Sequence, residues 1–150
     1  MAERHSRKVN RLRDFDYSAP GAYFVTFCTK DKRKCFWKTE VFSDGLSPAG
    51  ELLRRSILEI PFNYPYVQVK AYAVMPNHVH LLLVIREGNQ VSLSTVVGQV
   101  KQCVSTSLGG GLWQKSFYDH VVRDDAGFQR IWIYTTYNHL KWDEDCFFTP

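Results

Sequence analysis

The sequence has no long apolar run, few cysteines and an opening segment unlike a secretory leader. No stretch approaches the roughly 20 consecutive apolar residues that span a bilayer. The opening segment, MAERHSRKVNRLRDFD, has no apolar core after its basic residues, so it does not resemble a secretory signal. The cysteines show neither CxxC spacing nor the density of a disulfide scaffold; they are Cys28, Cys35, Cys103 and Cys146. We therefore expect no membrane partner and a reduced, cytoplasmic setting.

The 150 residues also contain no internal repeat and no low-complexity linker, which predicts a single domain over residues 1–150. Acidic residues are scarce at its start. Residues 1–38 carry ten Lys/Arg against four Asp/Glu, a net +6, which leaves −2 for the rest of a chain whose total is +4. Residues 1–16 are thus expected to form a basic N-terminal arm. Aromatic residues interleave with the cations of this region, which suits a polyanion with bases to stack on, although a solvated tail and a basic turn would give the same pattern.

Hydrophobic periodicity and breaker residues predict the order β-α-β-β-α-β followed by one more helix. Ser47 and Pro48 have the residue types of a helix N-cap and first turn, and the segment PFNYP is expected to end that helix. The expected strands cover residues 21–29, 67–75, 78–85 and 116–122, and the expected helices cover 47–60, 93–108 and 126–142. This order is the α+β, ferredoxin-like split βαβ plan with an antiparallel sheet.

The segment AYAVMPNHVHLLLVI places two histidines in an otherwise apolar strand. His78 and His80 are two residues apart, so they point to the same face of the strand from Cα atoms about 6.5 Å apart. Two imidazoles at that spacing can converge on one metal ion if a third ligand comes from elsewhere. The HxH pattern alone is weak, because two hydrogen-bonded core histidines or a pH-sensitive pair would look the same. The face that carries them needs a cover, and the terminal helix is the obvious candidate.

That helix, in FQRIWIYTTYNHLKW, carries a polar stripe. Tyr134 and Asn138 are four residues apart and share a helical face, with Lys141 about one turn after them and Arg130 about one turn before. Taken singly, an amphipathic core tyrosine and a solvated asparagine are the simpler interpretations. Facing a histidine pair, the stripe offers a nucleophile, a third metal ligand and phosphate-binding cations.

These segments resemble a known family. VMPNHVHLLLVI resembles the His-hydrophobic-His motif of the HUH endonucleases. LWQKSFYDHVVRDDAGFQRIWIYTTYNHLKW resembles the C-terminal half of the single-tyrosine transposases, especially the branch associated with repetitive extragenic palindromes (REP), and YFVTFCTKDKRKCFW resembles the first strand and turn of that family. The chain departs from the usual pattern of the tyrosine helix, with Thr135 for isoleucine and His139 for proline. His139 lies off the helical face of Tyr134 and is not counted as a ligand.

The resemblance implies a metal-dependent enzyme that binds Mg²⁺ or Mn²⁺ and cuts and rejoins single-stranded DNA beside a hairpin. On that pattern Tyr134 is the catalytic nucleophile that forms a 5′-phosphotyrosine link and frees a 3′-OH. His78, His80 and Asn138 are the metal ligands. The candidate DNA-binding cations are Arg130, Lys141, Lys30, Lys32, Arg33 and Lys34. The expected partner is single-stranded DNA with hairpin ends, and the resemblance leaves open a monomer or a homodimer with shared active sites.

Two other interpretations compete. A zinc hydrolase could use His78, His80 and His120, provided that His120 faces the same side of the sheet. A non-catalytic nucleic-acid-binding protein, including a domesticated transposase relative, could stack bases on Tyr23 and Phe27, which share a face of the first strand. The first predicts zinc binding that survives Asn138→Ala, and the second predicts single-strand binding that ignores both metal and Tyr134→Phe.

Overall fold

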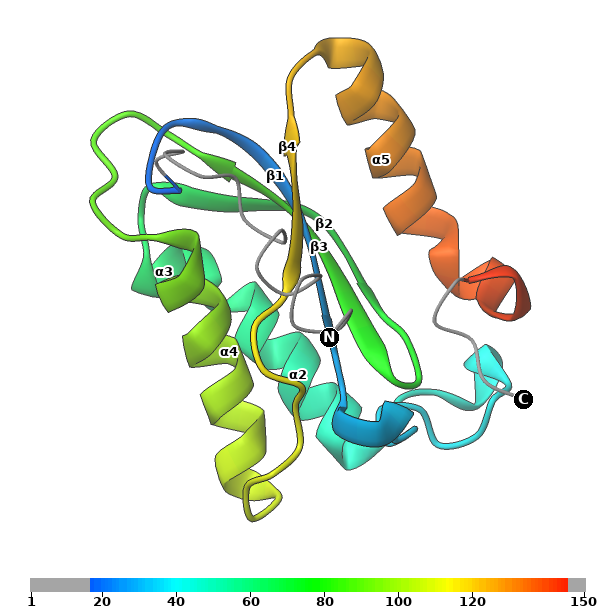
Figure 1. Ribbon diagram of the computed structural model, residues 1–150. Helices are drawn as coiled ribbons and strands as arrows, with labels where there is room; N and C mark the ends of the chain where they lie inside the picture. The colour runs from blue at the N-terminus through cyan, green and yellow to red at the C-terminus, as the bar shows by residue number, and fades with distance from the viewer. Residues whose placement is uncertain (1–16, 146–150) are drawn as a thin grey trace, which may run out of the picture.

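A computed structural model of the protein describes residues 17–145, so the expected N-terminal arm and Cys146 lie outside the described residues. Four antiparallel strands form one sheet in the order β2-β3-β1-β4 (Figure 1). The strands are β1 (Gly21–Cys28), β2 (Val67–Val74), β3 (His78–Ile85) and β4 (Tyr118–Val122). The helices are α2 (Pro48–Leu58), α3 (Ile60–Asn63), α4 (Leu93–Ser107) and α5 (Asp125–Tyr137), with 3₁₀ turns η1 (Lys30–Lys32), η2 (Phe42–Asp44) and η3 (Asn138–Glu144). The predicted ferredoxin-like α+β fold is confirmed.

The two faces of the sheet have different covers. The alternate residues Val79, Leu81 and Leu83 of β3 are fully buried in the main hydrophobic core, which includes apolar residues of α2 and α4. Helix α5 contacts β2 and β3, and Figure 1 shows it on the opposite side of the sheet from α2 and α4. The terminal helix therefore covers the face of His78 and His80, as expected. Among the described residues, none of the helices is long and apolar enough to cross a membrane.

Two predicted helix ends are wrong. The first helix was expected to cover residues 47–60 and to end at PFNYP. Instead α2 ends earlier, at Leu58, and a short helix, α3, runs into PFNYP with Pro61 in its first turn. Proline is tolerated there because N–H groups in the first turn of a helix have no acceptor within the helix, so the lack of one costs no hydrogen bond. The last helix does not reach residue 142, because α5 ends at Tyr137 and the chain continues as 3₁₀ turns in which Lys141 leaves helical geometry (φ −127°, ψ 39°). This kink turns the following residues back toward the sheet.

The segment before α2 is held tightly against that helix. Ser47 caps α2 by accepting a hydrogen bond from the Gly50 amide at 3.1 Å, and its own amide donates to the Phe36 carbonyl at 2.9 Å. A Cβ on Gly50 would lie 2.0 Å from that carbonyl oxygen, so only glycine fits here. The predicted cap at Ser47 thus also fixes residues 36–46, which support the site described next.

Candidate active site

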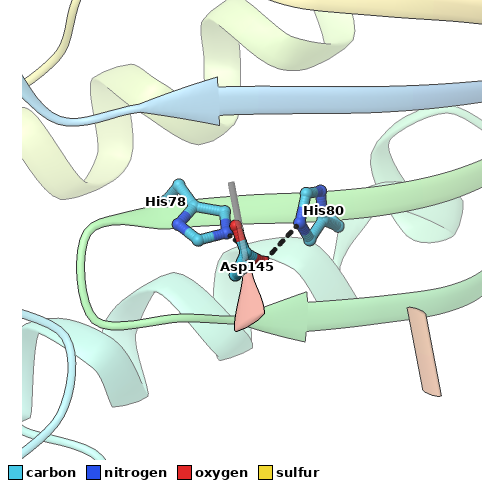
Figure 2. A group of neighbouring side chains, drawn as sticks. All are labelled: His78, His80 and Asp145. Carbon is cyan, nitrogen blue, oxygen red and sulfur yellow. Dashed lines mark hydrogen bonds and ion pairs between the residues drawn. The ribbon is translucent and has the colours of Figure 1, made fainter. Parts of the chain in front are cut away.

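A cluster of three buried ligand-type side chains lies on the sheet face under α5. His78 and His80 come from β3, and Asp145 is the residue that directly follows η3 (Figure 2). One carboxylate oxygen, Asp145 Oδ2, lies 3.1 Å from His78 Nε2 and 3.4 Å from His80 Nε2. The three potential ligand atoms all lie within 4.8 Å of one another. The cluster therefore gathers two imidazoles and a carboxylate around one point.

The other ring nitrogens of the histidines are held by outer partners. His78 Nδ1 lies 2.7 Å from Asn77 Oδ1, and His80 Nδ1 lies 2.8 Å from Thr26 Oγ1. Phe24 also stacks on the His80 ring, with centroids 5.2 Å apart. Partners of this kind fix the rotation and tautomer of a metal-binding histidine and leave Nε2 for the metal. Both Nε2 atoms are accordingly directed at Asp145.

The protonation states of the cluster suit a divalent cation. Burial lowers the pKa of His78 below its ordinary value, and neighbouring His80 adds to this, while Asp145 opposes it. Burial by itself would raise the pKa of Asp145, but hydrogen bonds from His78, His80 and Asn138 outweigh it and hold that pKa well below the usual range. Metal binding needs neutral imidazole and ionised carboxylate. The donor set therefore fits a bound divalent metal ion.

Asn138 lies at the cluster, but its side chain is hydrogen-bonded to Asp145, whereas the helical stripe suggested a direct metal ligand. Its side chain is buried, at 3% exposure, and its Nδ2 donates a 2.8 Å hydrogen bond to Asp145 Oδ2. It thus supports the carboxylate, and its role as a metal ligand stays a prediction. Asp145 was missed by the sequence interpretation. It follows the helix in an irregular, acidic segment, WDED, with no periodicity to assign it a face.

Tyr134 lies beside the histidines of its own chain. Its ring meets that of His80 edge to face, with centroids 5.5 Å apart and planes at 62°, and meets Phe24 at 6.2 Å. The side chain is 44% exposed. A phenol is therefore held against the candidate metal cluster while remaining accessible from outside, which is the placement a nucleophile requires.

The predicted DNA-binding cations are less closely gathered. Arg130 and Lys141 are exposed, but the kink at Lys141 ends the regular helical stripe that would join them. Lys34 pairs with Glu40 at 2.9 Å. The remaining members of the basic turn, Lys30, Lys32 and Arg33, are exposed in and after η1.

Features of the competing interpretations are also located. His120 is on β4 opposite Phe24, so it shares the histidine face, but it is exposed and is not among the grouped ligands of the described residues. Tyr23 and Phe27 are fully buried in the core, which contradicts their use as a stacking surface for bases. His139 packs on Phe42, with ring centroids 4.0 Å apart, consistent with leaving it out of the ligand set.

The η3 segment that carries Asp145 is anchored to residues 36–46. Trp142 Nε1 donates a 2.8 Å hydrogen bond to Glu40 Oε1, and this bond and Lys34 lower the pKa of Glu40. The Trp142 ring also lies 6.4 Å from the Trp37 ring and 6.0 Å from the His78 ring. The position of Asp145 therefore depends on a tryptophan that belongs to neither strand nor regular helix.

Known proteins resemble this chain in sequence and in fold. No protein-family model matches the sequence. A "REP-associated tyrosine transposase" of Escherichia coli is 22% identical, with 83% of this chain and 70% of the relative covered. A solved "REP associates tyrosine transposase bound to a REP hairpin" has the same fold, with a TM-score of 0.69, 22% identity, and coverage of 87% of this chain and 73% of that one. In sequence and in fold the chain thus resembles the REP-associated tyrosine transposases. An uncharacterized Haemophilus influenzae protein is 25% identical over 94% of this chain and 92% of its own length.

These similarities bear out the resemblance seen in the sequence.

The bond that anchors η3, from Trp142 to Glu40, gives a first test of the candidate metal site. Trp142→Phe removes the hydrogen bond to Glu40 and replaces none of the candidate ligands, so we expect about a 10-fold weaker Mn²⁺ affinity, as for other supporting residues of metal sites. Titration calorimetry of the purified variant measures this. Trp132→Phe, which alters an exposed tryptophan of α5, is the matched control. Equal affinities for the two variants would show that the anchor does not position Asp145.

The depressed pKa values predict acid sensitivity of the metal-free protein. Unfolded His78 takes up a proton near its ordinary pKa of about 6.5, whereas burial lowers the folded pKa. The folded state then binds fewer protons, so the free energy of unfolding falls as pH drops below about 6.5. Asp145, whose folded pKa is also depressed, adds a further loss below its unfolded pKa of about 3.9. Between pH 8 and 5, urea unfolding in chelator should show a smaller fall in the free energy of unfolding for His78→Gln than for the unaltered protein. An identical pH slope for the two proteins would contradict a lowered pKa of His78 in the folded state.

Proposed function

We propose that this protein is a metal-dependent single-stranded DNA transposase that cuts and rejoins DNA beside a hairpin through Tyr134. One observation carries the proposal: an accessible tyrosine ring lies against His80 in a buried cluster of two imidazoles and a carboxylate. The structural relative bound to a REP hairpin supports a DNA hairpin as the partner. Since one chain brings Tyr134 to its own histidines, the site can be completed without residues of a partner subunit.

His78, His80 and Asp145 would hold the metal ion, with Asn138 either orienting Asp145 or adding an oxygen ligand. A bound Mg²⁺ or Mn²⁺ would supply Lewis-acid polarisation of a phosphate oxygen and stabilise the charge that develops there. A ligand set with two imidazoles favours Mn²⁺ over Mg²⁺ in affinity, while the abundance of each ion decides which is used in a cell.

Tyr134 performs the covalent step. Its phenolic oxygen bonds to the scissile phosphorus as the bond from phosphorus to the 3′ oxygen breaks, and the phenol loses its proton to solvent while the leaving oxygen gains one. The products are a 5′-phosphotyrosine and a 3′-OH. Because one phosphoester replaces another, the step is reversible, and a second 3′-OH can attack the link to join a new strand.

A covalent-adduct assay tests the proposal. Single-stranded oligonucleotides with hairpin-forming sequences drawn from the flanks of the protein's own gene are mixed with the protein in Mn²⁺ or in chelator. They are labelled at the 3′ end, because the strand 3′ of the cut stays joined to the 5′-phosphotyrosine. A labelled, denaturant-resistant protein band that requires metal, with the phosphate mapped to Tyr134 by mass spectrometry, is the expected result. Hairpin binding without any adduct would instead support the non-catalytic binding protein.

The basic turn gives a prediction about binding alone. Neutralising Lys30, Lys32 and Arg33 to glutamine should weaken hairpin affinity and make it less salt-dependent. The slope of log K against log salt should fall by up to about 0.7–0.9 units for each phosphate that the protein no longer neutralises. Fluorescence anisotropy over a salt series measures the slope. An unchanged slope would mean that the turn only solvates the surface.

A further inference from the structure

A pocket lies directly beside Tyr134. Its volume is about 280 Å³, and its lining residues are Ile133, Tyr134, Tyr137, Asn138, Lys141, Glu144 and Asp145. The helical members come from one stripe of α5, and the kink at Lys141 brings the end of η3 around to close the other wall. The pocket is thus a product of the turn that carries Asp145 back to the histidines.

The walls of this pocket are mainly apolar and aromatic. Tyr137 is 56% exposed and Ile133 is also exposed, which is unusual for large apolar side chains next to a buried cluster. The volume is near the lower end of ligand pockets, about 300–1,000 Å³ for drug-sized molecules. The space therefore suits a single flat ring system rather than a longer segment of chain.

The polar groups of the pocket suit one nucleotide. Lys141 offers a cation for a phosphate, and Glu144 is an exposed carboxylate that can accept a hydrogen bond from an exocyclic amine. Asp145 is committed to the histidines and Asn138. Exposed aromatic rings hold unpaired bases by stacking in proteins that bind single strands.

We propose that this pocket binds the base of one unpaired nucleotide next to the scissile phosphate, stacked on Tyr137, with its exocyclic amine toward Glu144. This rests on the proposed function, because Tyr134 forms one wall and the nucleotide joined to the phosphate it attacks is within reach. The pocket then favours a base with an exocyclic amine, which is cytosine, adenine or guanine, over thymine at that position. It gives the protein a way to choose a cleavage position in single-stranded DNA that the hairpin itself does not specify.

Abasic scanning tests the pocket. Each unpaired nucleotide beside the hairpin is replaced in turn by an abasic site in the gene-flanking oligonucleotides, and affinity is measured with Tyr134→Phe, which cannot cleave but keeps the ring. At one position the abasic site should weaken binding by about 5- to 150-fold, the usual range for losing one base–aromatic stack. Tyr137→Ala in the same background should cause a similar loss on the intact oligonucleotide and little more on the abasic one. Tyr137→Phe should restore binding, and Tyr66→Ala, at an exposed tyrosine outside this pocket, should leave it unchanged.

The identity of the base is tested through Glu144. Substituting cytosine by thymine at the sensitive position should weaken binding, and Glu144→Gln, whose amide both donates and accepts, should reduce that discrimination. The proposed base-binding role of the pocket would be rejected if Tyr137→Ala and the abasic site weakened binding independently, so that their effects multiplied. It would also be rejected if no position were sensitive to loss of the base. These outcomes are separable from failure of the proposed function: an adduct without a sensitive position rejects only the pocket, and coupled binding losses without any adduct reject only the cleavage.

Discussion

Replacing Tyr134 with phenylalanine should lower covalent DNA-adduct formation by at least about 1,000-fold, since loss of a nucleophile removes the covalent route entirely. The substitution deletes one oxygen from a side chain that is 44% exposed and keeps the ring contacts with His80 and Phe24. The free energy of unfolding should therefore change by no more than about 0.5 kcal/mol. Hairpin affinity should stay within about twofold of the unaltered protein.

The matched control is Tyr66→Phe. Tyr66 has a similar exposed fraction, 46%, but its ring contacts Arg86 and it is not part of the histidine cluster. Initial rates of adduct formation, with affinity measured on the same preparations, separate chemistry from binding. An adduct that persists in Tyr134→Phe would mean that another group attacks the phosphate.

The second large effect concerns the metal. If Mn²⁺ binds only the folded protein, a concentration 100-fold above Kd raises the free energy of unfolding by about 2.7 kcal/mol. His80→Gln and Asp145→Asn should each abolish most of this gain, because the first removes one of the three imidazole and carboxylate donors that lie within 4.8 Å and the second removes the negative charge of another. Urea unfolding with and without Mn²⁺ measures the effect. His120→Gln, at an exposed histidine on the same sheet face, should keep the full gain.

Asn138→Ala distinguishes the two candidate oxygen ligands. If Asn138 only orients Asp145, its loss should weaken Mn²⁺ affinity by about 10- to 100-fold and leave binding detectable. If Asn138 is itself the third ligand, Asn138→Ala should be the more damaging change and Asp145→Asn the milder one. Tight Zn²⁺ binding that survives Asn138→Ala and requires His120 would instead revive the zinc hydrolase.

The regular part of the fold was accessible from the sequence. Alternation along β3 assigned His78 and His80 to the face opposite Val79 and Leu81, and the bare face of a split βαβ sheet required the terminal helix as a cover. These inferences rely on repeating patterns, which a single sequence displays. The same patterns predict that Tyr134 lies near the histidine pair.

The irregular part was not accessible. Nothing periodic marks where α5 ends, and the departure of Lys141 from helical geometry depends on tertiary contacts such as the bond between Trp142 and Glu40. Asp145 reaches the cluster only through that departure. A pattern based on helix turns therefore found Tyr134 and Asn138 and missed the carboxylate.

The alternation along β3 has a consequence for folding errors. A slip of one residue in its pairing with β1 would turn every side chain of the strand to the other face. Two imidazoles would then enter the apolar core, and Val79 and Leu81 would replace them beneath α5. Burying unpaired polar groups costs several kcal/mol, which is comparable to the whole stability of many domains. A misregistered chain would thus be unstable as well as inactive, so quality control that removes unfolded protein would also remove molecules with a misassembled site.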